Sequence, residues 1–299
     1  MIDSRPYVDT PVIDLDVADR AATSAARQWG LPAPQRLRAG MNVLYRAGSV
    51  VIRVGYPTSS PSAGQRLATA LATNGIPVVM PVIGLAGQWE GFGVSGWEAV
   101  DRSDHLIDWE QVGESVRHLH QLSADVIPDD YPVPSPTVLP WWDFDARLAE
   151  VADEIDSAAR AGMDAAVARH AGWRDQVAHG AVICHGDIHP GNVVADGTVS
   201  RIGDWDLMCV AAPGWDHSFL LTYADRWGGD PDVYRAFASG YGRSFVDDPL
   251  AIGLAELRNL AATLMRIIAG RASATAAAEA RRRLRYWRGD PDAPAWRAS

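Results

Sequence analysis

Hydrophobic positions in the first hundred residues come in short runs that glycine, proline and serine interrupt. The runs VLYR and VVIRV lie on either side of Ala47-Gly48-Ser49, a pattern typical of two strands joined by a tight turn. It predicts a small antiparallel sheet. The expected elements are a helix over residues 14–29, strands within 36–56, a loop over 57–64, a short helix over 65–73 and strands over 78–83 and 89–95.

Beyond residue 101 the hydrophobic positions recur every three or four residues, which is the period of an amphipathic helix. One such stripe runs from Leu106 to Leu122 and another from Leu250 to Ile268. Between them, short apolar runs surround a polar segment. The expected elements are the first striped helix, a proline-rich link over 127–140, two helical segments within 141–176, strands over 181–184, 193–195 and 199–202, the second striped helix, a basic helix containing 281–288 and a frayed tail over 291–299.

Composition narrows the class of protein. The chain of 299 residues is 47% hydrophobic and 21% charged, which is ordinary for a folded domain and excludes disordered, collagen-like and disulfide-scaffold proteins. All 27 basic residues are arginine. The absence of lysine excludes a Walker-type phosphate loop and Schiff-base enzymes, including those that use pyridoxal phosphate, because each requires an amine.

Charge and cysteine content narrow the partners. A net charge of -10 disfavours contact with a nucleic-acid backbone, so we expect no nucleic-acid partner. The chain begins with no basic leader, and no run approaches about 18 apolar residues, so we expect no membrane partner and a cytoplasmic location. Cys184 and Cys209 are expected to be buried, reduced and structural. No motif indicates an oligomeric state.

The polar segment between the apolar runs carries the chemistry. It reads HGDIHPGN over residues 185–192 and is followed by GDWD over 203–206. Phosphoryl transfer requires a carboxylate that orients or deprotonates the attacking hydroxyl, and oxygen ligands for the Mg²⁺ that bridges the nucleotide phosphates. Asp187, Asn192 and Asp204 supply that set in the order in which kinases use it. A polar turn without chemistry is the alternative.

With these motifs the chain resembles the aminoglycoside phosphotransferase and choline kinase family. The order of sheet, LHQL helix at residues 119–122, catalytic loop and helical tail is also that of the family. The resemblance implies an α+β, protein-kinase-like two-lobed fold, with a small β-rich N-terminal lobe and a larger, mostly helical C-terminal lobe. We expect a nucleotide-binding lobe over residues 1–96, a hinge over 97–102, and a catalytic and substrate-binding lobe over 103–299.

Carried over by position, the resemblance makes Asp187 the catalytic base and places Mg²⁺ on Asn192 and Asp204. It makes His185 an organiser of the loop, and Asp216 a brace for it. His189 either forms a hydrogen bond within its own loop or contacts phosphate or substrate. Two interpretations of Asp206 remain open: it caps the following turn, or it points into the cleft and attracts a cationic substrate.

The nucleotide-binding half follows the family less closely. Arg53 stands where the family usually has a lysine that contacts the α- and β-phosphates, a contact that arginine can also make. The partner glutamate of the family falls near Gly64 or Gln65, so Arg53 is expected to lack its usual carboxylate. An outward-facing strand position is the alternative for Arg53.

Backbone and loop positions complete the expected nucleotide site. The loop containing Asn42 covers the phosphates or is an ordinary hairpin turn. The Glu98 carbonyl and the Val100 amide are expected to contact the adenine edge. Trp141, Trp142, Trp215 and Trp227 either pack helices or stack a substrate ring.

Together these observations predict an Mg²⁺-dependent enzyme that moves the γ-phosphate of ATP or GTP to a hydroxyl of a small molecule. Acidic residues beside the cleft favour a cationic acceptor, such as an aminoglycoside-like antibiotic or an amino alcohol. The alternatives are a kinase for a small metabolite or a sugar, and a pseudokinase-like module that binds nucleotide without turnover.

Overall fold

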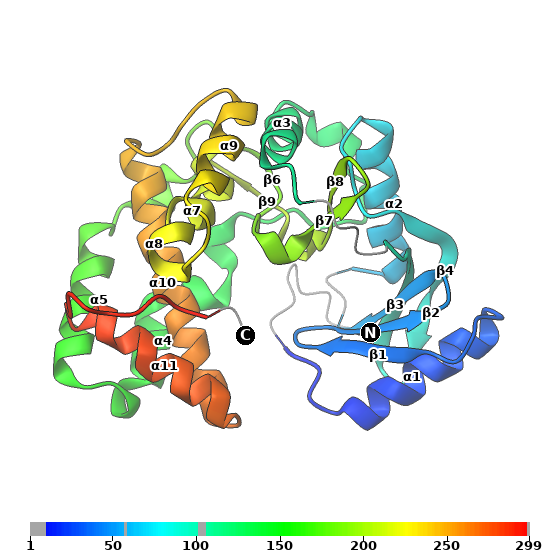
Figure 1. Ribbon diagram of the computed structural model, residues 1–299, viewed down its shortest axis with the longest axis horizontal. Helices are drawn as coiled ribbons and strands as arrows, with labels where there is room; N and C mark the ends of the chain where they lie inside the picture. The colour runs from blue at the N-terminus through cyan, green and yellow to red at the C-terminus, as the bar shows by residue number, and fades with distance from the viewer. Residues whose placement is uncertain (1–9, 57–58, 101–105, 298–299) are drawn as a thin grey trace.

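The computed structural model describes residues 10–56, 59–100 and 106–297. A five-stranded antiparallel sheet forms the N-terminal part, and helices form most of the C-terminal part (Figure 1). The α+β class and the two lobes therefore agree with expectation. The sheet runs in the order β1-β2-β3-β5-β4, with β1 at Gln35–Ala39, β2 at Val43–Ala47, β3 at Val50–Gly55, β4 at Pro81–Trp89 and β5 at Phe92–Glu98.

Two helices pack on the sheet for different reasons. Helix α1, Leu15–Gln28, begins at the capping carboxylate of Asp14 and buries a face of alanines, which lets it pack closely against β2, β3 and β5. Helix α2, Pro61–Thr73, begins earlier than predicted because Ser60 caps it and proline favours its first turn. Its Leu67 and Leu71 belong to a core shared with the C-terminal lobe.

The last two strands of the sheet lie later in the chain than the predicted 78–83 and 89–95. The turn between β4 and β5 is formed by Glu90 and Gly91, which both have positive φ, at 53° and 84°. Residues 77–79, which precede β4, instead form backbone hydrogen bonds with the C-terminal lobe. The Val79 amide donates to the Ile202 carbonyl at 3.0 Å, and the Ile202 amide donates to the Pro77 carbonyl at 2.8 Å.

The C-terminal lobe is built around the central helix α10, Pro249–Gly270, which agrees with the second predicted stripe. Helix α3 begins only at Trp109, because the Asp108 side chain caps it, and Leu106 is 92% exposed, so the predicted stripe was wrong at its start. The other helices are α4 Phe144–Glu150, α5 Ser157–Arg169, α6 Trp173–Gln176, α7 Gly214–Leu221, α8 Tyr223–Trp227, α9 Asp232–Tyr241 and α11 Ala274–Trp287.

Two small antiparallel pairs carry the polar segment. Strand β6, Val182–Cys184, pairs with β9, Cys209–Ala211, and β7, Val193–Asp196, pairs with β8, Val199–Ile202. Strand β9 was not predicted; its apolar residues run on without a turn signal into Ala212 and Pro213. Cys184 and Cys209 lie opposite each other in the first pair and are buried and free, as expected.

The predicted frayed tail is instead packed on the lobe (Figure 1). Trp296 is 2% exposed, and its amide donates to the Arg226 carbonyl. The Arg283 guanidinium packs on both Trp227 and Trp296, at 4.7 and 5.1 Å from their ring centroids. An aromatic ring and a buried cation thus fix the tail through residue 297.

All four tryptophans pack against other side chains of the C-terminal lobe. Trp142 and Trp215 are buried with their centroids 4.5 Å apart. The half-buried Trp141 packs against the same core, and the half-buried Trp227 lies 5.1 Å from the Phe219 ring. Across the described ranges, the structure contains no helix with the length and apolar character needed to span a membrane.

Candidate active site

The polar segment forms a loop between β6 and β7 that requires glycine at its turn. Gly186 has φ of 92°, and a Cβ at this position would lie 1.8 Å from the Leu207 carbonyl oxygen. A side chain is excluded on both grounds. The close approach brings the loop of Asp187 against the loop that follows β8.

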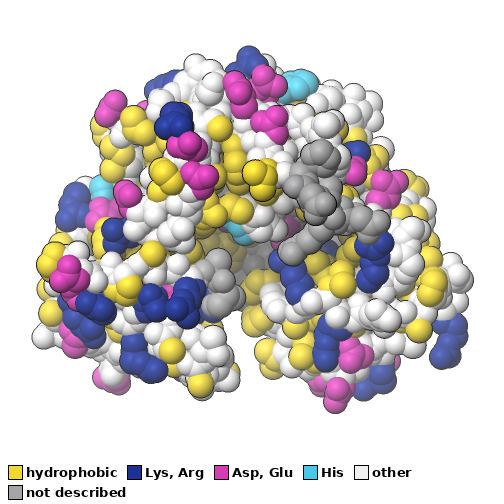
Figure 2. Space-filling model, in the orientation of Figure 1, with side chains coloured by type: hydrophobic (Ala, Val, Ile, Leu, Met, Phe, Trp, Pro, Cys, Tyr) yellow, Lys and Arg dark blue, Asp and Glu magenta, His cyan; other side chains and the backbone are white. Residues whose placement is uncertain are grey.

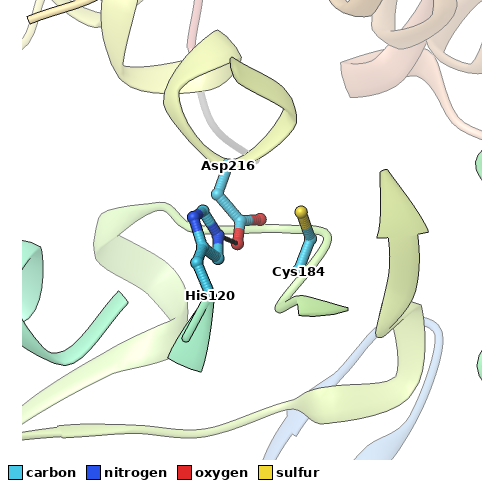
Figure 3. Close-up of side chains that lie close together, drawn as sticks. All are labelled: His120, Cys184 and Asp216. Atoms are coloured by element: carbon cyan, nitrogen blue, oxygen red, sulfur yellow. Dashed lines mark hydrogen bonds and ion pairs between the residues drawn. The ribbon is translucent and has the colours of Figure 1, made fainter. Parts of the chain in front are cut away.

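Asp216, in the first turn of α7, braces this loop from beneath. Its Oδ1 accepts from the Gly186 amide and its Oδ2 from the His185 amide, both at 2.8 Å. His120 Nε2 lies 3.1 Å from Oδ2 (Figure 3). Burial alone would raise the pKa of Asp216, but these hydrogen bonds and the neighbouring imidazoles lower it. Asp216 thus binds the two backbone amides at the start of the loop.

His120 and Cys184 flank the brace carboxylate in a buried cluster (Figure 3). Burial raises the pKa of the Cys184 thiol well above its ordinary value, and the thiol donates to the Ala211 carbonyl at 3.6 Å. His120 Nδ1 lies 2.9 Å from the Tyr241 hydroxyl. These contacts make the cluster a hydrogen-bonded support for the loop.

His185 joins the two loops. Its Nδ1 accepts from the Asp187 amide at 3.2 Å, so its Nε2 carries the proton and donates to the Gly203 carbonyl at 3.0 Å. The ring also packs on Trp205, with 4.6 Å between centroids. This fully buried histidine lies where the predicted organiser was expected.

Asp187 follows with its carboxylate partly open to the cleft, at 28% exposure. Oδ2 lies 3.3 Å from His189 Nε2 and 3.3 Å from Asn192 Nδ2, and Oδ1 lies 3.2 Å from Arg258 Nη1. Burial acts to raise its pKa, but His189 and Arg258 outweigh burial and lower it. Asp187 is therefore ionised at neutral pH. His189 bonds within its own loop, the first of its two predicted alternatives.

Asn192 and Asp204 lie on the same side of the cleft as Asp187. The Asn192 amide donates to the Asp187 carbonyl at 2.9 Å. Asp204 has φ of 60°, which is uncommon for a residue other than glycine. Burial, Asp206 and Asp187 raise the pKa of Asp204, although Arg53 opposes them. Carboxylate and amide oxygens are the ligands that Mg²⁺ prefers, and a cation would relieve the repulsion between the carboxylates, so these residues fit the ion.

Arg53 faces the cleft and has a carboxylate partner, so the expectation that it would lack one was wrong. Its Nη1 donates to Asp206 Oδ1 at 3.0 Å, its Nη2 forms a second short bond to Asp206 Oδ2, and Nη2 lies 3.5 Å from Asp204 Oδ1. Burial opposes the charge on Arg53, but Asp206 and Asp204 raise its pKa. Asp206 thus points into the cleft, where it forms an ion pair with Arg53.

Gln65 is one of the two positions at which the resemblance places the acidic partner of Arg53, and its contacts require an amide. It is 3% exposed, and its Nε2 donates to the carbonyls of Val82, Leu85 and Gly96 at 3.0, 3.0 and 3.2 Å. A carboxylate would face three acceptors. Gln65 therefore binds β4 and β5, and the partner of Arg53 comes from the other lobe.

Asn42, between β1 and β2, lies over Arg53. With its amide oriented so that the oxygen faces the guanidinium, that oxygen accepts from Nε at 3.3 Å and from Nη2 at 2.6 Å. The loop therefore contacts Arg53, the residue expected to bind phosphate.

One cavity of about 220 Å³ lies between the lobes, and neither Asp187 nor Asn42 lines it. Figure 2 shows the surface hollowed between the two lobes. Its polar lining includes Arg53, Glu98, Asn192, Asp204 and Asp206, together with Val100 of the predicted hinge. Residues 101 and 102 of that hinge lie outside the described residues. The apolar lining comes from both lobes: Leu44, Val51, Leu67, Val79, Trp97 and Trp205. A cavity with apolar walls and a charged end suits a nucleotide.

Two residues of this region were not predicted. Arg258 of α10 contacts Asp187, and its only signal is a charged residue beside the apolar stripe of that helix. Tyr131 lines the cavity, and its hydroxyl donates to the Trp205 carbonyl at 2.9 Å. It lies in the proline-rich link, where no pattern marked it.

Comparison with known proteins gives a family and a fold. The family model described as phosphotransferase enzyme family matches residues 62–260. None of the curated proteins matches the chain in sequence.

Several solved structures share the fold. A spectinomycin phosphotransferase in complex with ADP and spectinomycin is 17% identical, with a TM-score of 0.63 over 88% of this chain and 90% of that one. A choline/ethanolamine kinase family protein from Mesorhizobium loti is 19% identical, with a TM-score of 0.64 over 94% and 95%. The GDP complex of aminoglycoside 2'-phosphotransferase-IIIa is 15% identical, with a TM-score of 0.63 over 93% and 99%. These likenesses confirm the two-lobed fold.

Proposed function

The chain belongs to the phosphotransferase enzyme family, and from that premise we propose that it transfers the γ-phosphate of ATP or GTP to a hydroxyl of a small molecule. The observation that supports this most is that Arg53, Asn192 and Asp204 line one cavity and that Asp187 contacts Asn192 beside it. Two oxygen-bearing side chains and a cation at the charged end of an apolar cavity, with a carboxylate next to them, suit a nucleoside triphosphate with its metal.

In the proposed reaction Asp187 orients the acceptor hydroxyl toward the γ-phosphorus. The hydroxyl oxygen bonds to that phosphorus, the bond to the β–γ bridging oxygen breaks, and the hydroxyl proton passes to Asp187. Asn192 and Asp204 would hold Mg²⁺, which neutralises charge on the phosphates when bound. Because Asp187 is ionised and strongly hydrogen-bonded, it acts by positioning more than by basicity.

The nucleotide would lie with its base between the apolar walls of the cavity. Its adenine or guanine edge would meet the Glu98 carbonyl and the Val100 amide, and Arg53, with Asn42 above it, would contact the phosphates. The neighbouring fold members were solved with ADP, AMP and GDP, which supports a nucleotide in this place. We keep residues 1–96, 97–102 and 103–299 as the proposed nucleotide lobe, hinge and catalytic lobe.

We propose a hydroxylated and cationic acceptor. The fold neighbours include phosphotransferases for spectinomycin, macrolides and aminoglycosides and a choline/ethanolamine kinase family protein, which supports a small-molecule acceptor. The net charge of -10 supports a cationic one, because an acidic surface attracts cations.

The test measures nucleoside diphosphate release with Mg-ATP and Mg-GTP across aminoglycosides, macrolides, amino alcohols and sugars. We expect acceptor-dependent release that Asp187→Asn reduces by at least about 10³-fold while nucleotide affinity changes little. Asp196→Asn is the matched control, because Asp196 forms an exposed pair with Arg201 at 2.7 Å. Wild-type turnover in Asp187→Asn would refute the assignment of Asp187.

A binding module without turnover is the second candidate. The observation that favours it is the Arg53–Asp206 pair, which occupies the phosphate end of the cavity. Nucleotide binding seen as a thermal shift, together with no release for any acceptor, would support the module.

A further inference from the structure

Arg258 reaches the catalytic loop from a helix that the motifs do not include. It lies midway along α10, and its side chain is 13% exposed. Nη1 contacts Asp187 Oδ1 at 3.2 Å, and Nη2 donates to the Gly186 carbonyl at 3.0 Å. The two contacts fix both the carboxylate and the peptide unit before it.

A separate set of contacts fixes the guanidinium itself. Nε donates to the Ser218 hydroxyl at 2.8 Å, and the guanidinium carbon lies 5.1 Å from the centroid of the Trp215 ring. Both partners belong to α7, which also carries the brace Asp216. Because arginine has a planar fork with five donors, one side chain can bind the loop and α7 at once.

These contacts leave one orientation for the catalytic carboxylate. Oδ2 is engaged by His189 and Asn192, whereas Oδ1 is engaged by Arg258. Each carboxylate oxygen accepts about two hydrogen bonds, so Oδ1 can still accept one from an acceptor hydroxyl. Without Arg258 the carboxylate could rotate about its Cβ–Cγ bond, and Oδ1 would lose its defined direction.

We propose that Arg258 is a positioning residue for phosphoryl transfer, acting through the orientation of Asp187. This inference rests on the proposed function. A role in packing alone is the competing explanation, since a guanidinium on an indole ring also stabilises a helix contact. The two differ in what they predict: positioning changes turnover with little change in nucleotide affinity, whereas packing changes only the melting temperature.

The experiment compares Arg258→Met, Arg258→Lys and Ser218→Ala by steady-state kinetics and thermal melting. Arg258→Met is expected to lower kcat about 10²-fold, the scale of a misplaced catalytic group, with the nucleotide KM nearly unchanged. Arg258→Lys keeps the positive charge but loses the planar guanidinium, so its kcat should lie between those of the wild type and Arg258→Met. Ser218→Ala frees the guanidinium without removing it, so it reports on positioning even if Arg258→Met does not fold.

Arg283→Met is the matched control, because Arg283 is also a buried arginine on tryptophan rings but contacts the C-terminal tail. It should lower the melting temperature and leave kcat unchanged. Guanidinium ion added to Arg258→Ala is expected to restore part of kcat, which a lost packing contact would not allow.

The outcomes separate this inference from the proposed function. A wild type without turnover on every acceptor would refute the proposed function. A wild type with turnover, and the same kcat in Arg258→Met and Ser218→Ala, would overturn the positioning role alone. A raised nucleotide KM with unchanged kcat would overturn it as well, because Arg258 would then act on binding.

Discussion

The two halves of the candidate site are supported in different ways. In the C-terminal lobe, buried backbone amides, Asp216 and His185 fix the loop of Asp187 from below. In the N-terminal lobe, no described acidic residue of that lobe pairs with Arg53, which instead pairs across the cleft with Asp206 and Asp204. The catalytic half is thus supported from within its lobe, whereas the phosphate-binding half depends on the other lobe.

The two halves differ in how strictly their contacts constrain the residue types. The catalytic half combines a glycine turn, two backbone amides and a buried carboxylate, so a change at one position leaves others unsatisfied. The phosphate-binding half needs only a cation near the phosphates and an acid near the cation. The carboxylate can belong to either lobe, provided that it lies within ion-pair distance of the cation.

Asp216→Ala tests the catalytic half and should have the largest effect. The change leaves the His185 and Gly186 amides without their acceptor and His120 Nε2 without its partner, although His120 Nδ1 keeps the Tyr241 hydroxyl. We expect a loss of about 3–5 kcal/mol in unfolding free energy and nearly complete loss of activity. Urea denaturation measures the loss in unfolding free energy, and nucleoside diphosphate release measures the loss of activity.

Asp248→Ala is the control for that change. Asp248 also accepts from a backbone amide, that of Ala251 at 3.0 Å, but it caps α10 at the surface. Its loss should cost about 0.5–2 kcal/mol. Equal costs for the two variants would contradict the view that burial makes the brace essential.

Gln65→Glu tests whether the N-terminal lobe can regain an acid of its own. The carboxylate would face three backbone carbonyls, so we expect a loss of about 1–3 kcal/mol in unfolding free energy and no gain in nucleotide affinity. Gln65→Met is the control that removes the hydrogen bonds without adding charge. A tighter-binding and equally stable Gln65→Glu would show that the pairing across the cleft is not required.

Asp206→Asn tests the pairing across the cleft directly. The amide removes the charge beside Arg53 but keeps the size of the side chain. We expect nucleotide affinity to fall about tenfold, which corresponds to about 1.4 kcal/mol, because Arg53 loses its orientation. Calorimetry with ADP measures the change, with Asp196→Asn as the exposed control. Unchanged affinity would mean that Asp204 and Asn42 are sufficient to position Arg53.

The sequence predicted the catalytic half better than the phosphate-binding half for a physical reason. HGDIHPGN and GDWD lie on either side of one short hairpin, β7 with β8, so the pairing of these strands brings Asp204 back toward Asp187 and Asn192. The strand pattern around 36–56 was also sufficient for β1 to β3, because alternation and a turn with Gly48 at positive φ are local signals.

Contacts between residues distant in sequence were not predictable in the same way. Arg53 and Asp206 are 153 positions apart, and Asp187 and Arg258 are 71 apart. No periodicity encodes such a pair. The prediction of a frayed tail was wrong for the same reason. The proline and alanine content of the tail is typical of a frayed end, and the contacts of Trp296 with Arg283 and Trp227 are not encoded in any local pattern.

His189→Gln gives the smallest expected effect and tests the charge balance of the catalytic half. Burial lowers the pKa of His189, but Asp187 outweighs it, so the folded pKa lies above the ordinary 6.5. A raised folded pKa stabilises the folded state below pH 6.5, and that contribution is lost as pH rises through the folded pKa. The wild type should therefore lose stability from about pH 6.5 upward, and His189→Gln should lack this loss. At 29% exposure of the side chain the pair contributes less than about 1 kcal/mol. Urea denaturation at several pH values measures the slope, and an identical slope in both proteins would show that His189 is not charged by Asp187.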